Sequence, residues 1–381
     1  MFKCKISNKC GSCQLLDKEY DETLKIKLSH VNELFKKNNI NYVIKEINPS
    51  KNKIKYRNKM IVGFKYINND IIAGFYEENS HKIIAMDSCL MHSDNQNKIV
   101  QETIKIMKQL KLRPYDEDRR NGLIRYLLIK EGFKTNELMV VIVTGQEVFP
   151  GSNEFCKRIR SISPNIKTIV QNINTRKTSV VLGDKEKILF GNGYISDYLF
   201  DLRFNITSKS FFQVNPKQAE RLYSKVMEYA TLDNTKTIID AYSGVGTIGM
   251  YLSKFCKNVI SVENNKQAFL AAIYNAKVNN IKNVKFYNDD ATLFIKDLAY
   301  NKEKIDLIIM DPPRTGSTEE FIMSCVKLRP NKIVYVSCGP DTLARDLKLF
   351  LKNNYFISKA SCFDMFCFSN HIETVVCLER K

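Results

Sequence analysis

IIDAYSGVGTIG, residues 238–249, is the stretch that decides the fold of this chain. An apolar run ends near Asp240, three glycines follow at Gly244, Gly246 and Gly249, and a helical pattern begins among them. Glycines at such a position permit a tight turn and a close approach of the backbone to a ligand. The stretch predicts a strand, a glycine-rich turn and a helix. Alone it fits a nucleotide-binding edge, a dinucleotide site or a plain strand–helix turn.

The sequence around this stretch repeats the order strand, turn, helix, which predicts a parallel, doubly wound sheet with helices on both faces. Two closing runs, 355–362 and 371–379, have no helix between them and indicate an antiparallel hairpin at one sheet edge. We therefore predict an α/β, Rossmann-like domain with a seven-stranded sheet over residues 206–381. Its other apolar runs are 236–241, 258–262, 284–287, 305–310 and 332–337, and its helical stretches are 247–255, 265–279, 317–328 and 341–353.

Residues 1–205 have a different pattern and predict a mostly β domain. Apolar residues at helical spacing predict an amphipathic helix over about 15–38, which could pack against the second domain. The remaining predictions are a hairpin at 67–77, buried strands at LMVVIVTG (138–145) and TSVVLG (178–183), and helices near 94–111 and 152–161.

Composition favours a soluble protein with a polyanionic partner. Lys plus Arg outnumber Asp plus Glu by 59 to 41, and cationic side chains displace the counterions that condense on phosphates. A genomic bias toward Lys, Asn and Ile would also produce this surplus. The stretches 45–59 and 119–127 mix cations with aromatics, which suits RNA, although a solvated lysine-rich face is the alternative. No membrane span or signal peptide is evident, so we expect a cytoplasmic protein with reduced cysteines.

Acidic residues follow three further predicted strands at the ligand-binding edge of the sheet. Glu263 could accept hydrogen bonds from ribose hydroxyls, which suits NAD and S-adenosylmethionine equally. Asp290 could hold an adenine amino group. Asp311 opens DPPRTG (311–316), a stiff segment at the carboxyl edge. Methyltransferases that act on planar bases often carry a related loop beside the methyl donor, so this segment favours S-adenosylmethionine.

The fifth predicted strand delivers Cys338 at the same edge. Most cysteines are small buried hydrophobic residues. This one leaves an apolar strand, precedes Gly339 and Pro340, and lies just before a predicted helix. A helix N-terminus lowers the pKa of a nearby thiol and favours the thiolate. The position therefore indicates a reactive cysteine.

With these motifs in place, the chain resembles the bacterial uracil-5 RNA methyltransferase family, most of all its iron–sulfur members that act on 23S ribosomal RNA. The resemblance rests on the order and spacing of motifs across residues 210–376. These motifs are SFFQVNPKQAERLY (210–223), DAYSGVGTIG (240–249), DPPRTG (311–316), YVSCGPDTLARD (335–346) and FDMFCFSNHIETVV (363–376).

The resemblance implies methyl transfer from S-adenosylmethionine to carbon 5 of a uridine in RNA. It implies that Cys338 adds to carbon 6 of the base, so that carbon 5 can attack the methyl group. It further implies that Glu373 removes the proton from carbon 5. The implied contacts of S-adenosylmethionine are Gln213, Tyr242, Glu263 and Asp311, to which we add Gly244, Gly246 and Asp290 as candidates.

Cys4, Cys10 and Cys13 crowd the start of the chain, and Cys89 stands apart. Their spacing leaves a [4Fe–4S] cluster, a zinc ion and free thiols open. The cluster fits better than zinc, because structural zinc sites more often use two close pairs. The family resemblance implies a [4Fe–4S] cluster with a structural role.

The sequence departs from the family pattern in three places, and several alternatives stay open. We expect no small β-barrel RNA-binding domain before Cys4, Gly339 stands where Asn is common, and Cys367 stands where Pro is usual. The alternatives are a transfer RNA uracil-5 methyltransferase, a cytosine-5 RNA methyltransferase, a nicotinamide oxidoreductase and a non-catalytic iron–sulfur RNA-binding protein. No obligate protein partner is indicated, and we expect a monomer.

Overall fold

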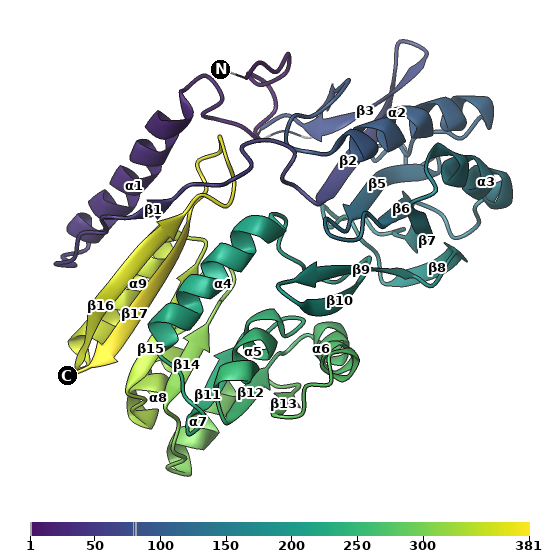
Figure 1. The fold of residues 1–381 in the computed structure, drawn as a ribbon. Helices are drawn as coiled ribbons and strands as arrows, with labels where there is room; N and C mark the ends of the chain where they lie inside the picture. The colour runs from purple at the N-terminus through teal and green to yellow at the C-terminus, as the bar shows by residue number, and fades with distance from the viewer. Residues whose placement is uncertain (1, 79, 81) are drawn as a thin grey trace.

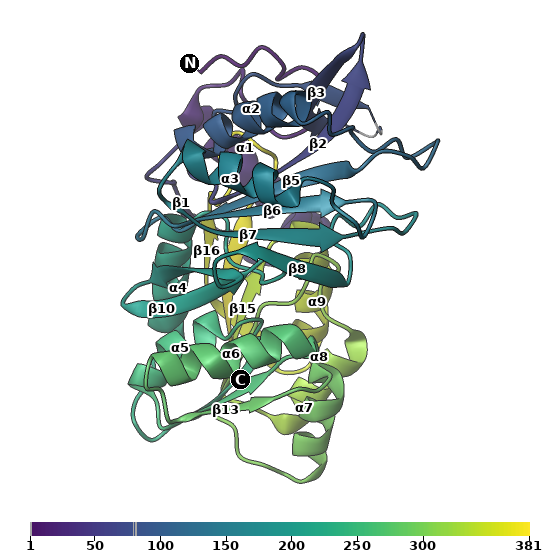
Figure 2. The same cartoon turned by 90° about the vertical axis from the view of Figure 1, so that its right-hand side faces the viewer.

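A computed structural model describes residues 2–78, 80 and 82–381 of the chain (Figure 1). The described residues form one sheet of eight strands, one of seven, and a two-stranded ladder of β9 (Tyr194–Leu199) and β10 (Leu202–Thr207). The two large sheets occupy different halves of the molecule, as Figures 1 and 2 show from two directions. None of the helices in the described ranges is long and apolar enough to cross a membrane.

The eight-stranded sheet contains the glycine-rich stretch and follows the predicted doubly wound plan. Strand β17 is antiparallel to both its neighbours, whereas the other pairs are parallel. The predicted closing hairpin is therefore confirmed. The predicted number of seven strands is wrong, because β1 adds an eighth beside β16. In spatial order the strands are β1 (Ile47–Asn48), β16 (Tyr355–Phe363), β17 (Glu373–Arg380), β15 (Lys332–Ser337), β14 (Leu307–Met310), β11 (Thr237–Ala241), β12 (Asn258–Val262) and β13 (Val284–Tyr287).

Helices cover both faces of this sheet because successive strand residues point to opposite sides. Ile238 packs with α4 (Pro216–Ala230), α5 (Thr247–Leu252) and α6 (Lys266–Val278). Its neighbour Ile239 packs with the other group: α1 (Tyr20–Lys37), α7 (Ala291–Tyr300), α8 (Glu319–Leu328) and α9 (Pro340–Lys352). A short 3-10 helix, η1 (Ser253–Phe255), follows α5. The sequence pattern did not predict α4 or α7.

The seven-stranded sheet is also covered on both faces. One face packs against α2 (Asp94–Gln109) and α3 (Ser152–Ile162), which confirms the two predicted helices. The other face shares a hydrophobic core with β9, β10 and α4, so a single core connects the two halves of the molecule. In spatial order the strands are β4 (Ile83–Ala85), β3 (Asp70–Tyr76), β2 (Lys59–Ile67), β5 (Ile124–Glu131), β6 (Leu138–Thr144), β7 (Ile166–Ile173) and β8 (Lys185–Phe190).

Local predictions in this half had mixed outcomes. The hairpin at 67–77 is confirmed, and its turn residues Asn68 and Asn69 both have positive φ, as a tight two-residue turn requires. The buried strand predicted at 178–183 is wrong. Val180 in that segment is 56% exposed. The side-chain amide of Asn174 donates hydrogen bonds to the backbone carbonyl groups of Val180 and Val181. These bonds close a loop, and strand β8 begins after it.

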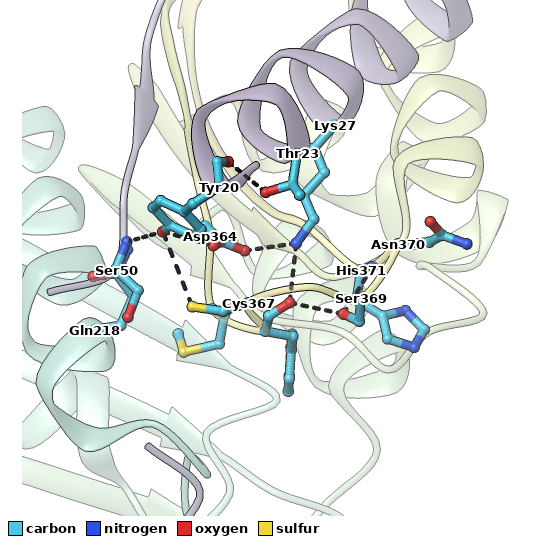
Figure 3. A network of polar contacts seen from close by, with 12 residues as sticks. Tyr20, Thr23, Lys27, Ser50, Gln218, Asp364, Cys367, Ser369, Asn370 and His371 are labelled. Atoms are coloured by element: carbon cyan, nitrogen blue, oxygen red, sulfur yellow. Dashed lines mark hydrogen bonds and ion pairs between the residues drawn. The ribbon is translucent and has the colours of Figure 1, made fainter. Parts of the chain in front are cut away.

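Helix α1 comes from the start of the chain but packs on the eight-stranded sheet. Its residues Val31 and Phe35 lie in the same core as α8 and α9. On the neighbouring turn, Lys27 Nζ lies 2.6 Å from Asp364 Oδ1, and the two side chains are 1% and 0% exposed (Figure 3). A domain border between residues 205 and 206 remains our proposal, with α1 and β1 packed across it.

Removing one partner of this buried ion pair should destabilise the protein strongly. Lys27→Met would leave Asp364 buried beside fewer donors, and breaking such a pair costs about 3–5 kcal/mol. Urea unfolding followed by circular dichroism measures this loss. Lys296→Met, which breaks an exposed pair with Glu320, is the control and should leave the transition midpoint almost unchanged. Equal midpoints for the two variants would contradict the prediction.

Candidate active site

The glycine-rich turn after β11 adopts the conformation that its sequence predicts. Gly244 and Gly246 have φ values of 57° and 83°, in the left-handed region that favours glycine. A Cβ atom on Gly244 would meet no other atom within 4 Å, so that side of the turn is open. A Cβ atom on Gly249 would lie 2.7 Å from Asp240 Oδ2, so this glycine lets α5 pack closely on β11. Tyr242 also has positive φ, 62°, without being glycine.

Buried polar atoms gather beneath this turn. Asp240 Oδ2 accepts a hydrogen bond from the amide of Gly249, at 2.8 Å. Asp240 Oδ1, Ser243 Oγ and Ser261 Oγ are buried and have no hydrogen-bond partner among the described residues. Burial also raises the pKa of Asp240 to about 7. Because buried polar atoms are normally paired, this surrounding fits a polar ligand such as S-adenosylmethionine.

Glu263 lies beside the turn, as the sequence predicts. It follows β12, and its carboxylate accepts hydrogen bonds from the amides of Gly244 (2.8 Å) and Asn265 (2.7 Å). Asp290 lies between β13 and α7, as the sequence predicts, and has a further role there. It is exposed and caps α7, accepting hydrogen bonds from the amides at the start of that helix. A contact of Asp290 with adenine therefore stays a prediction, and the structure assigns this residue a helix-capping role.

The sheet register brings the two predicted reacting residues together. Cys338 directly follows β15, and Glu373 is the first residue of β17. Ser337 and Thr374 form the last pair of this antiparallel ladder, and Cys338 and Glu373 are the residues directly beyond it on the two strands. Asp311 follows β14, the parallel neighbour of β15, and therefore lies at the same carboxyl edge of the sheet.

Burial raises the pKa values of all three groups, and neighbouring carboxyl groups raise those of Cys338 and Glu373 further. Burial raises the pKa of Cys338 to about 11, with Glu373 and Asp311 adding to the effect and Arg314 opposing it. The pKa of Glu373 lies well above its ordinary value, through burial and then Asp311. Burial raises the pKa of Asp311 to about 7. Our prediction of a favoured thiolate is therefore wrong for the protein without substrates: α9 does begin at Pro340, but burial and two carboxyl groups outweigh its effect.

Gln213 lies on the loop between β10 and α4, where the two halves of the molecule meet. Its carbonyl oxygen accepts a hydrogen bond from Asn58 Nδ2, at 3.0 Å. Its side chain lies near enough to the hydroxyl of Tyr223, a buried residue of α4 that our site prediction omitted, to lower the pKa of that hydroxyl. This hydroxyl also lies 3.3 Å from Thr247 Oγ1, and the nearby Asp311 contributes to its raised pKa. The available signal was that Tyr223 closes the motif 210–223.

The three N-terminal cysteines and Cys89 lie close together in the structure. Cys4, Cys10, Cys13 and Cys89 line one pocket, and all are free thiols. Burial raises the pKa of Cys13 to about 12, and the other three cysteines add to the rise. Thiol donors gathered in this way suit an iron–sulfur cluster. Within the described residues, however, no group of three or more His, Cys, Asp or Glu side chains has metal-site geometry.

The basic stretches that we predicted for RNA binding are only partly exposed. Lys51, Lys53 and Lys55 are exposed, whereas Arg57 is largely buried beside the cysteine pocket. Arg125 is buried too, and its guanidinium donates to the carbonyl oxygens of a neighbouring loop. Within these two stretches, the side chains available for phosphate contacts are the exposed lysines of the first and the exposed arginines of the second, Arg119 and Arg120.

Together, the doubly wound sheet, the glycine-rich turn with Glu263 and the acidic loop at Asp311 define a Rossmann-like methyltransferase. The family model described as tRNA (Uracil-5-)-methyltransferase matches residues 19–381. The chain belongs to this family, which confirms the resemblance and the prediction of an RNA methyltransferase.

Relatives of known sequence and one solved structure support the same family assignment. Uncharacterized RNA methyltransferases of Halalkalibacterium halodurans and Caldanaerobacter subterraneus are 37% and 38% identical to the chain. Each alignment covers 99% of this chain, and 83% and 84% of the relatives. The crystal structure of Pyrococcus abyssi tRNA (uracil-54, C5)-methyltransferase with S-adenosyl-L-homocysteine has a TM-score of 0.79 and 28% identity. That match covers 96% of this chain and 85% of the other.

The raised pKa of Cys338 predicts slow, strongly pH-dependent alkylation in the protein without substrates. Between pH 7 and pH 9 the thiolate fraction, and with it the rate, should rise about tenfold per pH unit, because both values lie below the pKa. Mass spectrometry of the Cys338 peptide after timed exposure to iodoacetamide measures this rate, with Cys338→Ser identifying the peptide. A plateau below pH 8 would show that a thiolate already predominates.

Proposed function

We propose that this protein transfers a methyl group from S-adenosylmethionine to carbon 5 of a uridine in RNA, with Cys338 as nucleophile and Glu373 as base. The observation that carries the proposal is the register between β15 and β17, in which these two residues directly follow the last pair, at the edge that holds the glycine-rich turn. A nicotinamide oxidoreductase would leave Cys338 and Glu373 without a role. The neighbouring Asp311 likewise stands where cytosine-5 RNA methyltransferases usually carry a second cysteine.

The first step is addition of sulfur to the base. Cys338 must lose its proton, and Asp311, with a pKa of about 7, can accept it. The thiolate then adds to carbon 6 of uracil, and the ring becomes an enolate with a nucleophilic carbon 5. The target base must leave its stack for this, because both faces of the ring have to be reached.

The second step moves the methyl group and restores the aromatic ring. Carbon 5 attacks the methyl group of the donor, which departs as S-adenosylhomocysteine. Glu373, as carboxylate, takes the proton from carbon 5, and the bond between carbon 6 and the Cys338 sulfur breaks. The donor carries a positive charge, so its binding beside these acidic groups would favour their ionised forms.

The methyl-donor site would use residues of three strand ends. We infer that Glu263 accepts hydrogen bonds from the ribose and that Tyr242, Gly244 and Gly246 line the turn beside the donor. Gln213 and Asp311 would contact it from the side of the reacting base. The open side of Gly244 and the unpaired atoms at Asp240 support this assignment.

Two RNA substrates remain candidates for this activity. We propose 23S ribosomal RNA, because the cysteine segment resembles that of the ribosomal RNA members of the family. Transfer RNA is the alternative, supported by the matching family model and by the likeness to the Pyrococcus abyssi tRNA (uracil-54, C5)-methyltransferase. Ribosomal RNA and transfer RNA from cells lacking the gene can each be incubated with the purified protein and radioactive methyl donor. The RNA class that gains the label is the substrate.

We further propose that Cys4, Cys10, Cys13 and Cys89 hold a [4Fe–4S] cluster. Their convergence on one pocket supports this. When bound, the cluster would tie the N-terminal segment to the region around Cys89. Methyl transfer is not an oxidation, so the proposed reaction uses none of its redox chemistry. A cluster protein that only binds RNA is the alternative, and absence of methyl transfer to any RNA would favour it.

Substitution of the two reacting residues should stop the reaction at different points. Cys338→Ala should bind RNA but form neither product nor covalent complex, because the nucleophile is gone. Glu373→Gln should still add and methylate but eliminate slowly, so that a methylated RNA–protein adduct accumulates. Denaturing gels with radioactive methyl donor detect this adduct as a slower band. The double variant is the control and should show no band; normal turnover by Glu373→Gln would contradict the mechanism.

The cluster proposal predicts a brown protein after purification without oxygen. It should absorb broadly near ~400 nm and contain about four irons per chain. Iron and sulfide analysis measures this, and Cys13→Ser should lose iron while Cys256→Ser, a buried cysteine elsewhere in the fold, should keep it. Stoichiometric zinc without iron would contradict the proposal.

A further inference from the structure

The loop 364–372 connects β16 to β17 and ends at the proposed base. Phe363, the last residue of β16, pairs with Glu373, the first residue of β17. The loop thus leaves the sheet and returns to it at the same point. Phe368 within it has positive φ, 61°, which is unfavourable for an aromatic residue. Contacts from outside must hold such a loop in one conformation.

Helix α1 provides the strongest of these contacts. Lys27 Nζ donates to Asp364 Oδ1 at 2.6 Å and to the carbonyl oxygen of Phe366 at 2.9 Å. The hydroxyl of Tyr20 donates to Asp364 Oδ2 at 2.8 Å and accepts a hydrogen bond from the amide of Ser50. Figure 3 shows both side chains reaching Asp364 from α1. Both oxygens of a fully buried carboxylate are therefore paired with one helix.

The segment before α1 holds the far side of the same loop. The amide of Leu15 donates to the carbonyl oxygen of Phe368 at 2.8 Å, and the amide of Asn370 donates to Gln14 Oε1 at 3.3 Å. Residues 14–27 therefore form hydrogen bonds with the loop at several points along its length. From other elements, Asn215 Nδ2 donates to the backbone oxygen of Met365, and the hydroxyl of Tyr56 donates to that of Cys367.

The end of the loop faces the reaction centre. His371 has a lowered pKa through burial and through the neighbouring cations Arg314, Arg57 and Lys27. Arg314 also influences Cys338 and Glu373. Because Glu373 directly follows the loop, a shift of the loop would act first on Glu373, whereas the β15–β17 ladder from Thr374 onward would stay paired.

We propose that α1 positions the general base: Lys27 and Tyr20 act through Asp364 to fix loop 364–372, and through it the side chain of Glu373. The inference rests on the proposed role of Glu373. Lys27, Tyr20 and Asp364 are positioning residues, since they touch neither of the proposed reacting groups. Their effect should fall on proton removal from carbon 5, the step that needs Glu373, and not on methyl transfer, which precedes it.

A graded pair of substitutions tests this. Tyr20→Phe removes one hydrogen bond to Asp364, and Lys27→Met removes the ion pair. In single-turnover reactions with radioactive methyl donor, both should methylate RNA at a near-normal rate but release it slowly. The lifetime of the covalent adduct should rise about threefold for Tyr20→Phe and about tenfold or more for Lys27→Met. If Lys27→Met fails to fold, Tyr20→Phe alone decides.

A matched control separates positioning from stability. Arg125→Met also removes a buried cation, one whose guanidinium holds the loop near Asn174 in the seven-stranded sheet. It should lower the unfolding midpoint without lengthening the adduct lifetime. Hydrogen exchange should quicken at 364–372 in Lys27→Met, and not in Arg125→Met.

Other outcomes overturn the proposal or the proposed function in distinguishable ways. If Tyr20→Phe and Lys27→Met leave the adduct lifetime unchanged, or slow methylation and release equally, α1 has no positioning role. If Glu373→Gln itself accumulates no adduct, the assignment of the base fails, and the positioning proposal fails with it.

Discussion

The antiparallel insertion of β17 between β15 and β16 is the constraint on which the rest of the site depends. Parallel strands end at the carboxyl edge of a sheet and begin at the opposite edge. An antiparallel strand instead begins at the carboxyl edge, so Glu373 can open β17 and still lie beside Cys338. The same residue at the start of a parallel strand would lie a full strand length away from the cysteine.

This geometry has an electrostatic consequence. It gathers a half-buried thiol, that of Cys338, a half-buried carboxyl group, that of Asp311, and the buried carboxyl group of Glu373 near the cation Arg314. Desolvation disfavours ionisation of all three groups, and like charges add to this at Cys338 and Glu373. Without substrates, the pKa values of these three groups are therefore higher than those of ordinary cysteine, aspartate and glutamate side chains. A cationic methyl donor is the kind of ligand that would reverse this balance, which links substrate binding to activation of the nucleophile.

The start of the chain completes this arrangement. Helix α1 and strand β1 pack on the eight-stranded sheet, although the residues between them and β11 form the other half of the molecule. The cysteine pocket lies next to the same segment, with Tyr56 and Cys367 in one hydrophobic cluster with Leu16 and Tyr20. The beginning and the end of the chain are thus packed together around the loop that leads to Glu373.

Much of the fold could be predicted from local patterns. The glycines at 244–249, the alternation of strands and helices after them and the hairpin at Asn68 all depend on short-range periodicity and turn chemistry. Helix α7 was missed because it is short and largely apolar, and 178–183 was mistaken for a strand because its side-chain hydrogen bonds come from Asn174 outside the run.

The sequence by itself determined the order of the motifs and the choice of the proposed reactive groups, because residue type and spacing are local properties. Only the tertiary structure decided the pKa of Cys338, the eighth strand and the burial of Arg57, Arg125 and Lys27. Each of these depends on partners distant in the chain. Burial and charge act through space, and a linear pattern does not state which distant residues will be neighbours.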